Sequence, residues 1–183
     1  MKNIKLYEEL RQQCRKEHQM NLEALELNEQ AKHRAWLAWR EDRDNKEKEE
    51  EFSDYVQTCD KIRRRIEQIE GYLGDKWYMT EYLYTDSHAY EVVEVYSWNK
   101  MAVRRLDATL TEESKKALQE SFVPGGFCGY MDNSLQEYTY KSSDHYPIEI
   151  VRRHKDGKFY RPNTRTCPLV VESEPNEYRD FNL

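Results

Sequence analysis

The chain has 183 residues and a formal net charge of −6, with 35% charged and 38% hydrophobic residues. This composition is too polar for one core running through every segment, while 14 tyrosines and 4 tryptophans exclude a disordered acidic tail. No apolar run approaches the about 20 residues of a membrane helix, and no signal peptide is recognisable, so we expect a cytoplasmic protein. Because coating a duplex requires surplus cations, the charge also makes direct nucleic-acid binding unlikely.

The sequence divides near residue 73 into two expected regions. All five prolines and five of the six glycines follow this point. Such a shift separates a helical segment from one rich in turns. We therefore expect a helical or coiled-coil arm over 1–73 and a small β-rich domain over 74–183.

Apolar residues in the second half of the arm recur at alternating spacings of four and three, which predicts an amphipathic helix that packs on another helix. The charged run 40–51 is either the turn of a helical hairpin or the middle of one long helix. Asn45 and Ser53 as caps favour the hairpin. Because the apolar stripe is narrow, it predicts self-association into a homo-oligomer. The stripe consists of Tyr55, Cys59, Ile62, Ile66, Ile69 and Leu73.

The second region reads as an antiparallel sheet of five or six strands with one short helix, so the predicted fold class is α+β. Aromatic and β-branched residues mark the strands. Thr111 is placed to cap the helix over 112–120. The expected strand segments are 77–84, 90–98, 101–106, 135–141, 148–153 and 169–171, and a tight turn at 155–158 leads into 159–160.

Two clusters in this region are candidate binding sites. The run 84–90 places a hydroxyl, a carboxylate, an imidazole and a phenol before a strand, in Thr85, Asp86, His88 and Tyr90. They form either a site or a turn followed by a core tyrosine. In the loop 123–127, Gly125 and Gly126 offer backbone N–H groups to an anion and Phe127 a ring for stacking; alternatively, the loop only reverses the chain.

A third candidate is formed by two arginine pairs on predicted strands. One member of Arg104-Arg105 and one of Arg152-Arg153 can share a face and bind phosphate or carboxylate. The alternative is ion pairing with strand carboxylates, namely Glu91, Glu94, Glu137 and Glu149. The four cysteines are dispersed without metal-ligand spacing, so we expect free thiols, no metal and no cofactor.

Several of these motifs occur in the order found in a known family. The sequence over about 80–183 resembles small uncharacterised proteins of tailed phages and prophages. The motifs are an aromatic-Thr-Asp-x-His-Ala-aromatic run at 84–90, Pro-Gly-Gly-Phe at 124–127 and Tyr-x-Asp-Phe-Asn near the C-terminus. Ser87, Arg179 and Leu183 depart from the family pattern. The resemblance implies action in the host cytoplasm and adds Tyr178, Asp180 and Asn182 to the candidate site residues, without an established activity.

Our leading hypothesis is a phage-encoded, non-enzymatic binding protein that acts against host defence. It would either sequester a nucleotide-type signal or block a host defence protein, and no membrane partner is expected. One alternative is a nucleotide hydrolase or phosphodiesterase, in which His88 is the general acid or base and Asp86 orients it. Another is a structural phage component.

Overall fold

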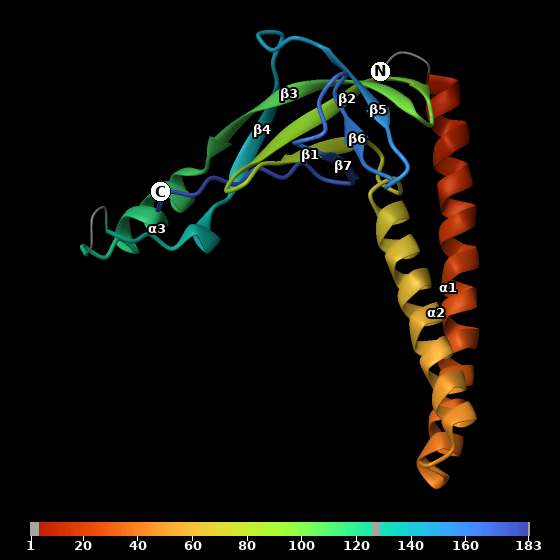
Figure 1. The fold of residues 1–183 in the computed structure, drawn as a ribbon. Helices are drawn as coiled ribbons and strands as arrows, with labels where there is room; N and C mark the ends of the chain where they lie inside the picture. Colours follow the sequence, from red (N-terminus) through yellow and green to blue (C-terminus); the bar gives the residue numbers. More distant parts are fainter. Residues whose placement is uncertain (1–3, 126–128, 183) are drawn as a thin grey trace. The chain divides into compact units, whose positions relative to one another are not determined.

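A computed structural model describes residues 4–125 and 129–182 (Figure 1). The chain divides into two compact units, one formed by Glu8–Leu73 and the other by Gly74–Leu183 together with the first residues through Tyr7. A helical hairpin makes up the first unit, and an antiparallel sheet with one short helix dominates the second. The predicted α+β class is confirmed.

The arm is a hairpin of two helices, α1 (Ile4–Glu41) and α2 (Lys46–Glu70). The turn falls inside the charged run because its residues have little to bury. Asn45 caps α2, and its side chain accepts hydrogen bonds from the backbone N–H groups of Glu47, at 3.1 Å, and Lys48, at 3.4 Å. Ser53 lies within α2, so its expected role as a cap is wrong.

The apolar stripe of α2 finds its partner helix within the same hairpin. Cys59 and Ile69 are 0% and 1% exposed. Across the two helices, the rings of Trp39 and Phe52 stack with centroids 5.8 Å apart. Arg65 donates a 2.7 Å hydrogen bond to Glu17 from the other helix. The hairpin thus accounts for the stripe from which we predicted self-association.

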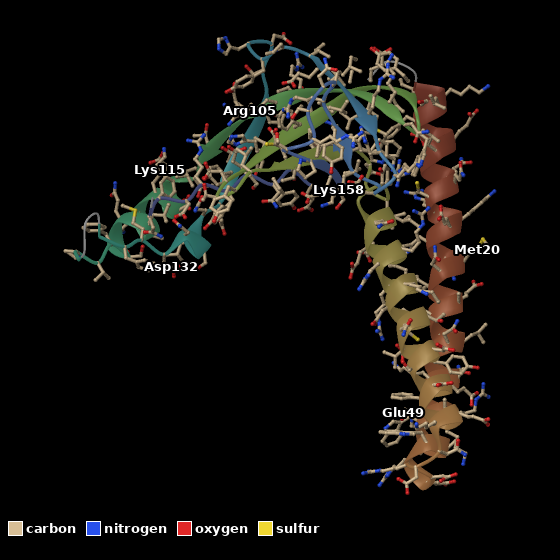
Figure 2. The ribbon with its side chains drawn as sticks, in the orientation of Figure 1. Met20, Glu49, Arg105, Lys115, Asp132 and Lys158 are labelled. Atoms are coloured by element: carbon tan, nitrogen blue, oxygen red, sulfur yellow. The ribbon has the colours of Figure 1, made fainter. Side chains whose placement is uncertain are left out.

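Self-association of the arm stays a prediction. Exposed apolar side chains of α1, which do not belong to the predicted stripe, are the ones that such a contact would bury. Met20 and Leu27, seven residues apart on α1, are 69% and 66% exposed. Figure 2 shows the Met20 side chain pointing away from α2. Because residues seven apart share a helix face, the two side chains leave an apolar strip open to solvent. None of the described helices is both long and apolar enough to cross a membrane.

Seven antiparallel strands form the sheet of the second unit, in the order β2-β1-β7-β6-β5-β3-β4, where we expected five or six. Pairing of β2 with β3 closes six of them into a ring. The long β3 makes this closure, because it pairs with β2 along one edge and with β5 and then β4 along the other. The strands are β1 (Tyr78–Tyr82), β2 (Ser87–Ser97), β3 (Lys100–Leu110), β4 (Tyr138–Ser142), β5 (Glu149–Arg153), β6 (Phe159–Tyr160) and β7 (Leu169–Glu172).

Apolar side chains fill the inside of the closed sheet. Each comes from an inward-facing strand position, as the two-residue period of a strand requires. Outside the ring, α3 (Glu112–Glu120) begins at Thr111, whose side chain accepts from the Ser114 N–H at 3.1 Å, as predicted. A short 3-10 helix (Asn133–Leu135) precedes β4. The core side chains that are fully shielded include Met79, Met101, Val103, Val151, Phe159 and Leu169.

We predict that Ile69→Ala destabilises the hairpin by about 2–5 kcal/mol, because it removes buried methyl groups and leaves a cavity. Urea unfolding followed by circular dichroism at the helix band measures the change. Gln57→Ala, at an exposed position of α2, is the matched control and should shift the free energy of unfolding by no more than about 0.5 kcal/mol. Equal stability of the two variants would contradict the packing of α2 on α1.

Candidate functional site

The two motifs at 84–90 and 177–182 lie side by side, although most of the domain separates them in sequence. Ser87 and Tyr178 exchange two backbone hydrogen bonds, of 2.9 and 3.1 Å. The Asp86 carboxylate accepts a 2.9 Å hydrogen bond from the backbone N–H of Asp180. The C-terminal segment thus pairs with the start of β2, on the edge along which β3 pairs with the residues from Tyr90 onward.

Glu177 is the centre of this junction, and its side chain is fully shielded from solvent. It accepts a 2.9 Å hydrogen bond from the Ala89 N–H, and His88 Nδ1 lies 3.2 Å from its other oxygen. The Arg105 guanidinium approaches to 3.5 Å. Burial alone would raise the pKa of Glu177, but the hydrogen bonds from His88 and Ala89 and the charge of Arg105 hold this pKa below its ordinary value.

The remaining tail residues bind the segment before β4. Asp180 accepts a 2.7 Å hydrogen bond from the Asn133 side chain. The Asn182 side chain accepts from the Met131 N–H at 2.7 Å and donates to the Met131 carbonyl at 2.9 Å. These contacts occupy the polar atoms that a ligand would need. We call the segment 177–182, with these contacts, the C-terminal latch.

Three residues of the 84–90 cluster make contacts that differ from those of the site predicted from the sequence. His88 contacts Glu177, whereas Asp86, the residue expected to orient it, bonds to the latch backbone. Tyr90 is buried and its hydroxyl donates to Glu81 at 2.8 Å while accepting from Arg161 at 2.7 Å. It is therefore a core residue and offers no ring for stacking.

Arg161, which the sequence did not single out, compensates the charges of two carboxylates in the closed sheet. Its guanidinium contacts the carboxylates of Glu81 and Glu149 as well as Tyr90. Burial, with the neighbouring Glu81 carboxylate, raises the pKa of the Tyr90 phenol. The only sequence signal was an arginine directly after a short apolar strand, which does not by itself indicate burial.

The pair Arg104-Arg105 is used for ion pairs. Arg104 lies 2.8 Å from Glu91, as the salt-bridge alternative had it, and also contacts Asp144. Arg105 points to Glu177, and its guanidinium lies 5.6 Å from the centre of the Tyr146 ring. Neither arginine is available as a phosphate ligand unless one of these carboxylates is displaced.

The structure describes two further residues of the predicted site, Thr85 and Gly125. Thr85 is half-buried in the turn before β2. Gly125 is exposed, and its carbonyl accepts a 2.7 Å hydrogen bond from the Gly129 N–H. Gly126 and Phe127 lie outside the described residues. A cavity of about 350 Å³ next to Trp77, Tyr140 and Leu106 is lined also by the Glu91–Arg104 ion pair, whose charges compensate each other.

The second arginine pair lies at a different surface, where β3 and β5 place two cations opposite each other and β6 adds a tyrosine. Lys100 on β3 stands directly opposite Arg152 on β5, and Arg152 stands directly opposite Tyr160 on β6. Directly opposed residues share a face of the sheet, and like charges in this position destabilise it. Among residues 4–125 and 129–182, no carboxylate lies within salt-bridge distance of Lys100, Arg152 or Lys155.

We call Lys100, Arg152, Arg153, His154 and Lys155 the basic surface. It borders two hollows, one of about 580 Å³ next to Asn99 and one of about 650 Å³ next to Arg165. Arg152 and His154 line both. In Figure 2, Lys158 in the β5–β6 turn and Arg105 on β3 mark separate places in this unit.

Aromatic rings support the cations of the basic surface. The Arg153 guanidinium lies 4.6 Å from the centre of the Trp98 ring, and the Lys100 ammonium lies 4.8 Å from that of Tyr96. His154 meets the ring of Tyr160 edge-on at 4.9 Å. Of this surface the sequence indicated Arg152 and Arg153. Lys100, His154 and Lys155 join them only through strand pairing and the β5–β6 turn.

No protein-family model matches the chain, and neither does any curated protein or solved structure. The phage resemblance therefore stays a prediction from the motifs alone. Within the described residues, no group of three or more His, Cys, Asp or Glu side chains could hold a metal ion.

The C-terminal latch should weaken in acid because of Glu177. Its pKa in the folded protein lies below the ordinary 4.5, so it stabilises the fold above that pH, and this contribution is lost as the pH falls through the lowered value. We expect the melting temperature of the wild type to fall more steeply below about pH 4.5 than that of Glu177→Gln. Thermal unfolding in a series of buffers from neutral to acidic pH measures this. Parallel curves for the two proteins would contradict the prediction.

Proposed function

We propose that the protein is a phage-encoded, non-enzymatic binding protein that acts against host defence by capturing a nucleotide-type ligand on the basic surface. One observation carries the proposal: Lys100 and Arg152 oppose each other across β3 and β5, and no carboxylate among the described residues lies within salt-bridge distance of either. A bound phosphate would relieve their repulsion. The role against host defence depends on the resemblance to phage proteins.

The side chains of the basic surface suit a phosphate. A guanidinium presents paired donors to phosphate oxygens, and an ammonium adds a point charge. The ring of Tyr160, which lines one of the hollows, offers apolar surface to a base. Donors, positive charge and an aromatic ring together favour a nucleotide over a simple carboxylate.

The hydrolase alternative loses its proposed pair of residues. It requires Asp86 to orient His88, but Asp86 accepts the Asp180 N–H and His88 contacts the buried Glu177. Glu177 and His88 belong to the C-terminal latch, away from the basic surface in sequence and in sheet position. The geometry therefore supports capture rather than turnover.

Exposed aromatic residues favour a second candidate function, the blocking of a host defence protein. Tyr84 is 103% exposed at the turn before β2, and Tyr178 and Phe181 of the adjacent latch are 37% and 39% exposed. The latch contacts gather these rings from distant parts of the sequence. Aromatic side chains are frequent anchors at protein interfaces.

We predict that Arg152→Glu weakens nucleotide binding at least about tenfold, because it removes a charge-assisted hydrogen bond and adds repulsion. The variant should fold, because the introduced carboxylate would pair with Lys100 on the neighbouring strand. The protein is mixed with labelled ATP, a labelled cyclic dinucleotide and labelled oligouridylates at near-physiological salt, and retention is measured by filter binding. Lys116→Glu, a substitution of a cation by a carboxylate at an exposed position of α3, is the matched control and should leave retention unchanged.

Heating the complex and analysing the released label distinguishes capture from hydrolysis. We expect the intact ligand. Retention of no probe, or an unchanged retention by Arg152→Glu, would contradict the capture function, and a cleaved product would replace it by the hydrolase alternative.

A further inference from the structure

We infer that the ligand of the basic surface is a short single-stranded oligonucleotide whose phosphates lie on both sides of a ridge formed by Arg152 and His154. This inference rests on the proposed function and names its ligand class more narrowly. It follows from three features of the surface: the two hollows, the state of the aromatic rings and the local charge.

The two hollows can each receive one phosphate. Arg152 and His154, two residues apart in sequence, separate them and line both. Lys100 and Lys155 add positive charge to one hollow, and Arg165 adds it to the other. Because neighbouring strands lie about 4.8 Å apart, the row Lys100–Arg152–Tyr160 is about 10 Å across. A chain with phosphates at successive nucleotides can place one in each hollow.

A single nucleotide fits this surface poorly. The residues that border the hollows, among them Arg152, Lys155 and Arg165, are themselves exposed, so neither hollow encloses a ligand. One face of the Trp98 ring is covered by Arg153 and one face of Tyr96 by Lys100, so a base cannot be held between two rings. Affinity must therefore come from several phosphates together, with a base stacking on Tyr160, which lines the second hollow, as in single-strand binding sites.

The distribution of charge limits the ligand to a short length. The net charge of −6 argues against nucleic-acid binding, but this value is a sum over the whole chain and is not the charge at the basic surface. The segment 149–165 carries six basic residues and two acidic ones, and Glu149 is already paired with Arg161. The rest of the chain is more acidic than the average and repels a long polyanion. The basic residues of the segment are Arg152, Arg153, Lys155, Lys158, Arg161 and Arg165.

The experiment compares fluorescently labelled oligouridylates of increasing length, with uridine monophosphate as the single-nucleotide probe, by fluorescence anisotropy. We expect the affinity to rise at least about tenfold from the monophosphate to the trinucleotide, as contacts to further phosphates are added, and then to change little. With about two or three phosphates neutralised, the logarithm of the binding constant should fall against the logarithm of salt concentration with a slope of about −1.4 to −2.1.

Arg165→Ala separates the two hollows. It should weaken binding of the trinucleotide about fivefold or more and weaken binding of the monophosphate by no more than about twofold, because the first hollow, which Arg165 does not line, still holds a single phosphate. Lys116→Ala on α3 is the matched control and should alter neither. Thermal unfolding of each variant confirms that the exposed substitutions leave the fold intact.

Equal binding of monophosphate and trinucleotide would overturn this inference and leave the capture of nucleotides standing. An affinity that keeps rising to eight nucleotides, or equal binding of a duplex, would also overturn it, because the ligand would then extend beyond the two hollows. Binding of none of the probes, including ATP and the cyclic dinucleotide, would remove the proposed function as well.

Discussion

The pairing of β3 with three other strands determines most of the second unit. Through its contacts with β2 on one edge and β5 on the other, β3 closes six strands into a ring and shields side chains such as Val103 and Met101. The same pairing places Lys100 opposite Arg152. The core and the basic surface therefore have a common cause, since one strand register sets both the inward-facing apolar positions and the outward row of cations.

The C-terminal latch covers an edge of β2 that this closure leaves unpaired. Where β3 leaves β2 to pair with β4, the start of β2 would have an unpaired edge, and the latch supplies the missing backbone partner at Ser87. A buried glutamate at this junction needs compensating donors, which Ala89, His88 and Arg105 provide. The residues that look most like a catalytic cluster in the sequence are thus explained by the requirements of a strand end.

Charge is divided unevenly over the molecule. Carboxylates pair with Arg104, Arg105 and Arg161 around the closed sheet, whereas Lys100 and Arg152 stand together without one among the described residues. The paired arginines stabilise the fold, and the other two cations retain their capacity to bind an anion. The two arginine pairs look alike as sequence motifs. Their different ion pairing in the structure distinguishes the pair that stabilises the fold from the pair that we propose as ligands.

The sequence by itself determined the α+β class, the helical arm, the cap of α3 and most strand segments, because these follow from local periodicity, capping residues and turns. It favoured a hairpin for the arm but left one long helix open. It also indicated Arg152 and Arg153 as candidate ligands. Only the tertiary structure decided that Tyr90 is buried, that the Asp86 side chain binds the backbone of Asp180 and that Lys100 stands opposite Arg152. Those outcomes depend on which distant strands pair and in which register, and the pattern along one segment contains no information about its partner.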